Sequence, residues 1–390
     1  MHIELSDNQK AIQEMVREFA AREIAPHVAQ WDREEHFPVD VFRRMGELGL
    51  LGLPLPEEWG GGGGTFGEYA VAIEELAKVD AGLACAYSVH VSAHTNSVYE
   101  FGTEEQKQKY LARLCSGELI GAFALTEPSC GSDASALKTK AVEDGDFYVL
   151  NGTKQWITNA KSAGLFLLFA RTNPNEPGAK GITAFLIEAG TPGLTLGRKT
   201  HKMGMRSSET YDLILENCRV PKSAVIGTLN EGFKIAMKTL DAGRVGIAAQ
   251  ALGIAQAALD EAKKFANERE AFGQPINRFQ AIQWKIADMA VRINASRLLT
   301  YRAATLKDQG LPCTKEGAMA KLFASRTARE ACNDSLQIHG GYGYTDEFSI
   351  ERHYRDAKVT EIYEGTSEIQ KIVISRAVLG RTASRQPAKV

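Results

Sequence analysis

The amino-acid sequence predicts an α+β protein of three domains: an N-terminal helical domain at 1–120, a middle antiparallel β-barrel or sandwich at 121–228, and a C-terminal four-helix bundle at 229–390. Apolar residues recur at helical spacing in both end regions, whereas the middle has short strand-like runs with turn signals between them. The length of 390 residues also exceeds that of one small core. This order of elements argues against the alternating βαβ pattern of a dinucleotide-binding fold.

The N-terminal domain begins with a helix signal. Ser6 and Gln9 have the spacing of a capping box. Apolar residues then recur at helical spacing, namely Ile12, Met15, Val16 and Phe19. The glycine run 60–64 is expected to be a loop, because glycine disfavours regular elements. Helical patterns resume at 69–79 and 103–115, so the domain should be mainly helical.

The middle domain alternates apolar runs with turn signals. Asn151-Gly152 follows the run 147–150 and predicts a two-residue hairpin turn, and Asp144-Gly145 predicts another turn. Further strands are expected at 165–169, 182–187 and 211–215. Short strands joined by turns are typical of a small barrel or sandwich.

The C-terminal domain is expected to hold four amphipathic helices, which imply an antiparallel bundle. Their apolar stripes lie at 237–258, 282–293, 315–338 and 369–378. Ser367 and Gln370 have capping-box spacing before the last helix, and Gly380 fits its end. No G-x-G-x-x-G motif follows a strand and opens a helix, so a nucleotide would have to bind by another route.

Bulk properties exclude several classes of function. The net charge is −2, from 46 basic and 48 acidic residues, which gives no support for a nucleic-acid-binding surface. No run approaches the roughly 20 apolar residues of a membrane span, and the first residues resemble neither a secretory signal nor a transit peptide. A cytoplasmic protein is therefore expected. The six cysteines form no C-x-x-C pair, so neither a zinc site nor a disulfide framework is expected.

Two segments of the middle domain have the chemistry of a ligand site. Gly131, Ser132 and Asp133 follow the domain boundary, where backbone N–H groups and a hydroxyl suit a pyrophosphate. Trp156 and Thr158 share one face of a strand, so the indole can stack on a flat ring while the hydroxyl donates to the ring's edge. Taken singly, the first segment is equally typical of a turn and the second of a half-buried strand.

Four segments of the C-terminal domain carry further candidates. Arg244 falls on an apolar helix stripe and needs an anion, which a structural ion pair with Asp241 could also supply. Arg269 and Phe272 stand where a helix ends and could hold a phosphate and an adenine, or serve as a polar connector. The segment 337–344 has three glycines among aromatics, which indicates close backbone contact; its His339 has no metal-ligand spacing.

Glu364 precedes the last helix, beside a glycine and next to apolar neighbours. There its carboxylate can project into an apolar cleft, where desolvation would raise its pKa toward that of a general base. Taken alone, Glu364 would be interpreted as a solvated surface glutamate, as most glutamates are.

Together these segments resemble the acyl-CoA dehydrogenase family over essentially the whole chain. The marks are Leu125-Thr-Glu-Pro-x-x-Gly-Ser-Asp133, Trp156-Ile-Thr158, Asp241-x-Gly-Arg244, Arg269-x-x-Phe-Gly-Gln274, the segment 337–343 and Ile362-Tyr-Glu-Gly-Thr366. Each motif is modest evidence, but their joint occurrence in this order is hard to obtain by chance.

The resemblance implies a homotetramer, built as a dimer of dimers, with FAD bound between subunits. The residues that would contact FAD are Phe123, Leu125, Thr126, Gly131, Ser132, Trp156, Ile157, Thr158, Thr366, Ser367 and Glu368, with Arg269, Phe272, Gln280, Gln337, Ile338, Gly340 and Gly341 holding the ADP part of a neighbouring subunit's FAD. The acyl-CoA substrate would contact Ser132, Asp241, Gly243, Arg244, Tyr363 and Gly365. No metal is implied.

The resemblance also implies the reaction. Glu364 would remove the pro-R α-proton of a fatty acyl thioester while a β-hydride moves to flavin N5, giving a trans-2-enoyl-CoA in fatty-acid β-oxidation. An electron-transferring flavoprotein would reoxidise the flavin. Some branched-chain and long-chain members carry the base near 235–245, where this chain has no glutamate, so a short-chain substrate is expected. Short branched-chain or medium-chain substrates, a flavin oxidase and a non-catalytic helical scaffold are the alternatives.

Overall fold

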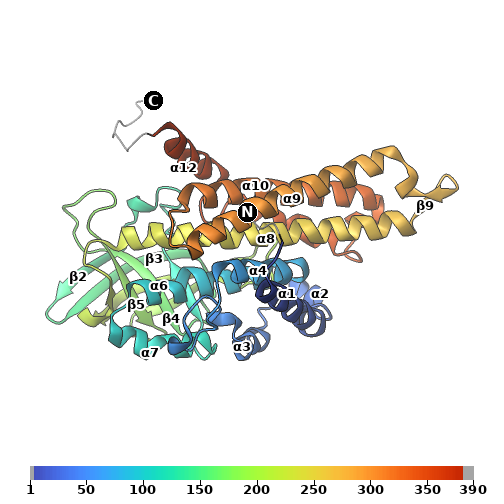
Figure 1. The fold of residues 1–390 in the computed structure, drawn as a ribbon. Helices are drawn as coiled ribbons and strands as arrows, with labels where there is room; N and C mark the ends of the chain where they lie inside the picture. Colours follow the sequence, from blue (N-terminus) through green and yellow to red (C-terminus); the bar gives the residue numbers. More distant parts are fainter. Residues whose placement is uncertain (1–3, 381–390) are drawn as a thin grey trace.

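A computed structural model describes residues 4–380, and its elements follow the predicted order of helices, strands and helices (Figure 1). The predicted fold class is confirmed. The sheet lies at one end of the molecule, and the long C-terminal helices extend away from it toward the opposite end (Figure 1). The π-helical segment Val89–Thr95 contacts the strand Gly121–Ala124, and the helix Gly232–Glu268 contacts the strand Ile182–Glu188, so helices from both end regions pack against the sheet.

The N-terminal part is helical as predicted, with a capping box at its start. Ser6 Oγ accepts from Gln9 N at 3.2 Å, and Gln9 Oε1 accepts from Ser6 N at 3.0 Å. A π-helical segment, Val89–Thr95, follows the fifth helix directly. The helices are α1 (Asp7–Phe19), α2 (Val28–Glu34), α3 (Val39–Glu47), α4 (Phe66–Val79), α5 (Ala81–Ser88), α6 (Asn96–Phe101) and α7 (Glu104–Cys115).

The middle part is one eight-stranded sheet in the order β6-β7-β3-β2-β4-β5-β8, with β1 paired to β4. Its strands are β1 (Gly121–Ala124), β2 (Lys140–Asp144), β3 (Phe147–Thr158), β4 (Leu165–Arg171), β5 (Ile182–Glu188), β6 (Leu194–Lys199), β7 (Thr210–Pro221) and β8 (Val225–Ile226). Strands β6 and β8 stand at opposite ends of the order, so the sheet is sandwich-like rather than a closed barrel. The pairs β1–β4 and β2–β4 are parallel, and the others are antiparallel as predicted.

The predicted hairpin turn at Asn151-Gly152 is wrong. Strand β3 continues through these residues. The register against β7 shifts between Leu150 and Gly152, where Asn151 alone opposes residues 216 and 217, so the extra residue of this bulge belongs to β7. Pairing with β2 on one side and β7 on the other outweighs the local turn preference. The turn at Asp144-Gly145 is confirmed, because it joins the antiparallel strands β2 and β3.

The C-terminal part is built on three long helices. Its elements are α8 (Gly232–Glu268), β9 (Glu270–Ala271), β10 (Gln274–Pro275), α9 (Gln280–Asp308), α10 (Thr314–His339), α11 (Ile350–Val359) and α12 (Ser367–Leu379). Helix α11 was not predicted. The cap of α12 also differs from the prediction: Thr366 Oγ1 accepts from Ile369 N, so the capping residue lies one position before Ser367. Gly380 ends the helix at φ 62°, as predicted.

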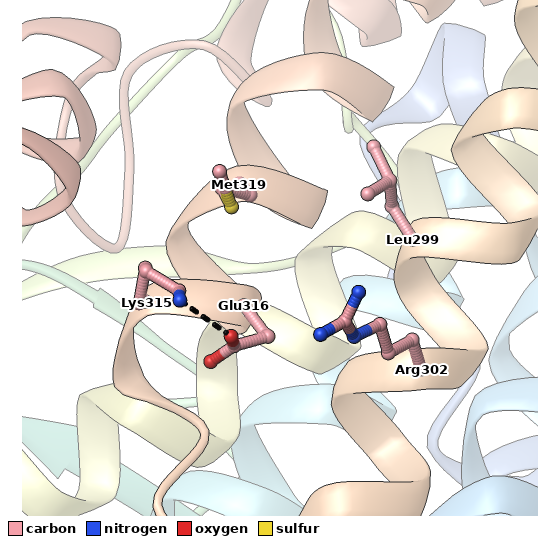
Figure 2. A pocket seen from close by; sticks show the side chains of 5 residues that line it. All are labelled: Leu299, Arg302, Lys315, Glu316 and Met319. Atoms are coloured by element: carbon pink, nitrogen blue, oxygen red, sulfur yellow. Dashed lines mark ion pairs between the residues drawn. The ribbon is translucent and has the colours of Figure 1, made fainter. Parts of the chain in front are cut away.

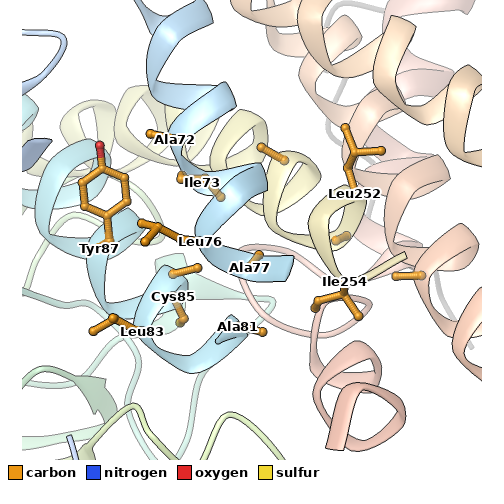
Figure 3. Packing of buried hydrophobic residues seen from close by; sticks show 14 of the residues in the cluster. Ala72, Ile73, Leu76, Ala77, Ala81, Leu83, Cys85, Tyr87, Leu252 and Ile254 are labelled. Carbon is orange, nitrogen blue, oxygen red and sulfur yellow. The ribbon is translucent and has the colours of Figure 1, made fainter. Parts of the chain in front are cut away.

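Helix α8 is the element that joins the three parts. It packs against α4, α9 and α10, and its start contacts β5. Alanine and glycine dominate its buried face, which lets neighbouring backbones approach closely. Figure 3 shows the core where α4 and α5 meet α8, with the buried side chains of Ile73 and Leu76 on α4, and Leu252 on the side of α8 toward the C-terminal helices. This rigid junction supports one end of the cavity described below.

All six cysteines are buried and free of disulfides, as predicted. Among residues 4–380, no set of three or more His, Cys, Asp or Glu side chains is placed to hold a metal ion. No helix in the same range is both long and apolar enough to cross a membrane.

Candidate active site

A cavity of about 670 Å³ lies where the sheet, the N-terminal helices and the C-terminal bundle meet. Its walls come from α5, the π-helical segment, β1, β3, the loop before β7, α8, α11 and the turn before α12. The predicted site residues that line it are Phe123, Leu125, Thr126, Gly131, Ser132, Trp156, Ile157, Thr158, Arg244, Tyr363, Glu364, Gly365 and Thr366. Segments up to about 240 residues apart in sequence therefore form one site.

Glu364 lies on the tight turn between α11 and α12, in a left-handed backbone conformation with φ 50°. Its Oε2 is buried and has no hydrogen-bond partner within the described chain. Gly243 of α8 provides the room for this carboxylate, because a Cβ at that position would stand 1.9 Å from Glu364 Oε2. The helix thus presents bare backbone to the carboxylate.

Burial and two cations set the charge state of Glu364. Burial raises the pKa of the carboxyl group to about 7, although Lys321 and Arg244 act in the opposite direction. An ionised carboxylate without a hydrogen-bond partner in a largely apolar cavity has the properties of a general base.

The sequence left open whether Arg244 pairs with Asp241 or binds a ligand, and the structure is compatible with both. Its side chain is buried and forms an ion pair with Asp241 three residues earlier, and Asp241 Oδ2 also accepts from Thr314 Oγ1 at 2.6 Å. Arg244 Nε nevertheless has no partner within the described residues, and the side chain lines the cavity. One donor therefore remains available to a ligand.

The turn that carries Glu364 is fixed from the α8 side through its neighbour. Tyr363 donates its hydroxyl to Gln250 Oε1, and Gln250 Nε2 donates to the carbonyl of Ala81 at 2.6 Å. This chain of hydrogen bonds ties the turn to both α8 and α5.

Another part of the cavity wall is formed by β3 and the segment after β1. Trp156 has φ 59° and is 57% exposed, so its indole faces open space on the cavity side. Below it, Lys154 is fully buried and donates to Glu127 Oε1 at 2.8 Å and to the Leu125 carbonyl at 3.1 Å. This buried ion pair holds the segment 125–127 against β3.

Other predicted residues do not line this cavity. These are Asp241, Gly243, Arg269, Phe272, Gln280, Gln337, Ile338, Gly340, Gly341, Ser367 and Glu368. Asp241 and Gly243 still act on it through Arg244 and Glu364. Phe272 is 95% exposed on the hairpin of β9 and β10, which projects at the far end of α8 (Figure 1). The Arg269 guanidinium lies 5.4 Å from the Tyr342 ring centroid, so these two distant segments adjoin one another. Ile338 is buried in the helical core.

Several site residues were missed. The loop 200–210 contributes Thr200, whose hydroxyl has no partner within the described residues, and the half-exposed Met203. Nothing in its sequence pattern indicated a site. Lys321 of α10, which approaches Glu364, carried the same signal as Arg244: a charged residue on a stripe of small apolar residues.

A second, small cavity of about 130 Å³ lies between α9 and α10. Figure 2 shows its five lining residues, among which Lys315 and Glu316 form an ion pair of 3.1 Å. It contains none of the predicted site residues and is too small for a cofactor.

Comparisons with known proteins agree with this geometry. The chain matches the acyl-CoA dehydrogenase N-terminal domain at residues 6–118, the middle domain at 122–218 and the C-terminal domain at 230–379. It is 50% identical to the mitochondrial short-chain specific acyl-CoA dehydrogenase of Mus musculus over 377 residues, covering 97% of this chain and 91% of the mouse protein.

Solved structures show the same likeness. Butyryl-CoA dehydrogenase from Megasphaera elsdenii is 44% identical with a TM-score of 0.96, covering 97% of this chain and all of that one. A chain from a structure described as the electron transferring flavoprotein of Acidaminococcus fermentans is 50% identical with a TM-score of 0.96 and the same coverage. The protein therefore belongs to the acyl-CoA dehydrogenase family.

Proposed function

We propose that this acyl-CoA dehydrogenase acts on short-chain acyl-CoA thioesters, with Glu364 as the base that removes the α-proton. The observation that carries the proposal is the Glu364 carboxylate, buried and without a partner on the cavity wall, with bare helix backbone at Gly243 beside it.

The family's members are FAD flavoproteins, and the cavity fits this cofactor. Trp156 offers an exposed aromatic ring, and the hydroxyl-bearing residues Thr126, Ser132 and Thr158 line the same cavity. A Cβ built at Gly131 meets nothing within 4 Å, so the backbone there borders open space suited to a phosphate. The partnerless Thr200 hydroxyl adds another donor. When bound, FAD supplies the acceptor for the substrate's β-hydride.

The reaction requires the protein to make an α-proton of a thioester removable. Glu364, with a pKa of about 7, is half ionised at neutral pH and more fully ionised above it. The desolvated carboxylate takes the α-proton, and its raised pKa brings it closer to that of the thioester's α-carbon. The Glu364 backbone N–H is a candidate donor to the thioester carbonyl, where negative charge develops as the proton leaves. The fixed turn around Tyr363 keeps the base aligned with the α-carbon. The product is a trans-2-enoyl-CoA.

A homotetramer explains residues that the single chain leaves apart from the cavity. Arg269, Phe272 and Gln280 lie at the far end of the bundle, where they can serve the ADP part of a neighbour's FAD. Apolar residues are also exposed every seventh position along α9, at Trp284 (65%), Val291 (69%) and Leu298 (45%), and again at the end of α12. Such a stripe is typical of a helix face covered by another copy.

The acyl chain length and the electron acceptor rest on the relatives. The mouse relative is described as short-chain specific and a similar solved structure as a butyryl-CoA dehydrogenase, which supports a short substrate. The likeness to a chain in an electron transferring flavoprotein structure supports such a flavoprotein as acceptor. Cytoplasmic location stays a prediction from sequence.

The test is anaerobic flavin reduction. The purified protein should be yellow, and butyryl-CoA should bleach it faster than hexanoyl-CoA or octanoyl-CoA do. Glu364→Gln should retain FAD and bind butyryl-CoA but fail to reduce the flavin. Near-normal reduction by Glu364→Gln would refute the base assignment, whereas faster reduction by octanoyl-CoA or by a branched acyl-CoA would refute only the chain-length assignment.

A further inference from the structure

Lys321 is a fully buried lysine that does not line the cavity, yet it reaches the turn that carries Glu364. Its Nζ donates to the carbonyl oxygen of Gly365 at 2.7 Å. A buried ammonium is costly unless it is paired or strongly hydrogen-bonded, and no carboxylate within the described residues lies within ion-pair distance of it. The ammonium group of Lys321 is therefore stabilised mainly by its contact with the active-site turn.

Gln370, also fully buried, approaches the same turn from α12. Its Nε2 donates to the Gly365 carbonyl at 2.8 Å and to the Glu364 carbonyl at 3.2 Å. Glu364 and Gly365 both have positive φ, at 50° and 91°, a conformation that is strained for glutamate. Two side chains from two helices thus hold a turn that would not persist by itself.

We infer that Lys321 and Gln370 are positioning residues for the base, and that the Lys321 ammonium keeps the Glu364 carboxylate ionised despite its burial. This inference rests on the proposed role of Glu364. Lys321 acts through charge and through the turn, and it touches neither acyl-CoA nor FAD.

The electrostatics around Glu364 support this inference. Burial raises the pKa of Glu364 and lowers that of Lys321 to about 8, so each group relieves the other's desolvation. The other charged group that acts on Glu364 is Arg244 of α8, which already shares its charge with Asp241. Three other titratable groups near Glu364 are Tyr69 of α4, Cys85 of α5 and Tyr363, whose pKa values are all raised by burial, so they stay neutral near pH 7. The carboxylates of Glu361 and Glu368, on either side of the turn, act on Lys321 and raise its pKa.

The variant Lys321→Met removes the positive charge while keeping the fold. Methionine has similar length, and the hydrogen-bond partner that it leaves behind is the neutral Gly365 carbonyl rather than a carboxylate in a salt bridge, so no buried ion pair is broken. The Gly365 carbonyl keeps its bond from Gln370. Loss of a neighbouring positive charge should raise the pKa of the base by about one unit or more. At pH 7 this lowers the ionised fraction, and with it the rate of flavin reduction, by about fivefold.

The measurement is the limiting rate of flavin reduction by butyryl-CoA, by anaerobic stopped flow, from about pH 6 to about pH 9. In the unaltered enzyme the rate falls on the acid side of the profile, and we call this fall the acid limb. In Lys321→Met its midpoint should move up by about one pH unit, while the rate recovers at high pH and the dissociation constant of butyryl-CoA stays unchanged. Lys321→Arg keeps the positive charge, so the midpoint of its acid limb should be the same as in the unaltered enzyme. As a matched control, Lys285→Met removes a lysine of α9 that pairs with Asp334, and it should change nothing.

An unshifted limb in Lys321→Met, with the rate lowered equally at every pH, would overturn the electrostatic role. If Lys321→Met does not purify with FAD, Lys321→Arg still decides, because a limb raised by a full unit there would contradict a role that depends on charge. Glu364→Gln distinguishes a failure of the proposed base from a failure of the proposed role of Lys321. If that variant reduces flavin normally, the base assignment fails first, whereas an inactive Glu364→Gln beside an unshifted Lys321→Met refutes only the present inference.

Discussion

Gly243→Ala is expected to impair catalysis without unfolding the protein. The added Cβ would stand 1.9 Å from Glu364 Oε2, whereas ordinary contact begins at about 3.4 Å, so the carboxylate must retreat by about 1.5 Å. A misplacement of about 1 Å can cost about 100-fold in rate. We therefore expect the limiting rate of flavin reduction to fall about 100-fold, which corresponds to about 2.7 kcal/mol of activation free energy. Stability should hold, because the atom displaced is the end of a side chain and alanine favours a helix interior.

The assay is single-turnover flavin reduction with butyryl-CoA, together with FAD content and thermal unfolding. Gly317→Ala is the matched control: it also adds a methyl group on a helix beside this site, but its Cβ would meet atoms of Arg244 and Asp241 at 3.6 Å, an ordinary contact. It should reduce its flavin normally. The reasoning is refuted if Gly243→Ala reduces flavin within about threefold of Gly317→Ala, since Glu364 would then tolerate the displacement or would not be the base.

Other expected outcomes test separate parts of the site. Flavin reduction in the unaltered enzyme should lose rate as the pH falls through about 7, because Glu364 must be ionised to accept a proton; a flat profile would contradict this. Arg269→Ala should weaken FAD retention while leaving the fold intact, so flavin content unchanged after dialysis would count against its phosphate role. Burial tends to raise the pKa of Glu127, but Lys154 and the hydrogen bonds at 138 and 139 outweigh burial and lower it. Glu127 therefore stabilises the fold at neutral pH, and this contribution is lost as the pH falls below its ordinary value of 4.5. Glu127→Gln should cost about 3–5 kcal/mol in denaturant unfolding at pH 7, and a loss that does not shrink in acid would disagree with this assignment.

The sequence predicted the elements whose signals are local, and failed where distant pairing decides. The capping box at Ser6 and the stop at Gly380 depend on a few adjacent residues, and both are present. Asn151-Gly152 carried an equally clear local signal, but strand pairing on both sides keeps these two residues within the continuous strand β3. The short helix α11 was missed, and its residues contribute to the cavity wall beside the loop 200–210.

The same distinction holds within the site. Sequence motifs predicted the aromatic and hydroxyl residues that line the cavity, because each motif consists of residues close together in the sequence. Lys321 and Gln370 touch no ligand, and each matters only because it meets the backbone of the turn at Gly365. The residues next to Lys321 and Gln370 in the sequence do not indicate these hydrogen bonds to Gly365.

Arg244 and Lys321 nevertheless share a recognisable property. Each is a single cation among small apolar residues on a buried helix face, on α8 and α10 respectively, and these two helices pack closely together. Burying such a charge is costly, so each of the two cations favours an anion nearby. Arg244 lines the same cavity as Glu364, Lys321 donates to the next residue of the turn, and both cations oppose the rise in the pKa of Glu364. A pair of unexplained cations on two adjacent helix stripes therefore predicts a buried carboxylate, and in a chain with a flavin cavity beside it that carboxylate is the expected base.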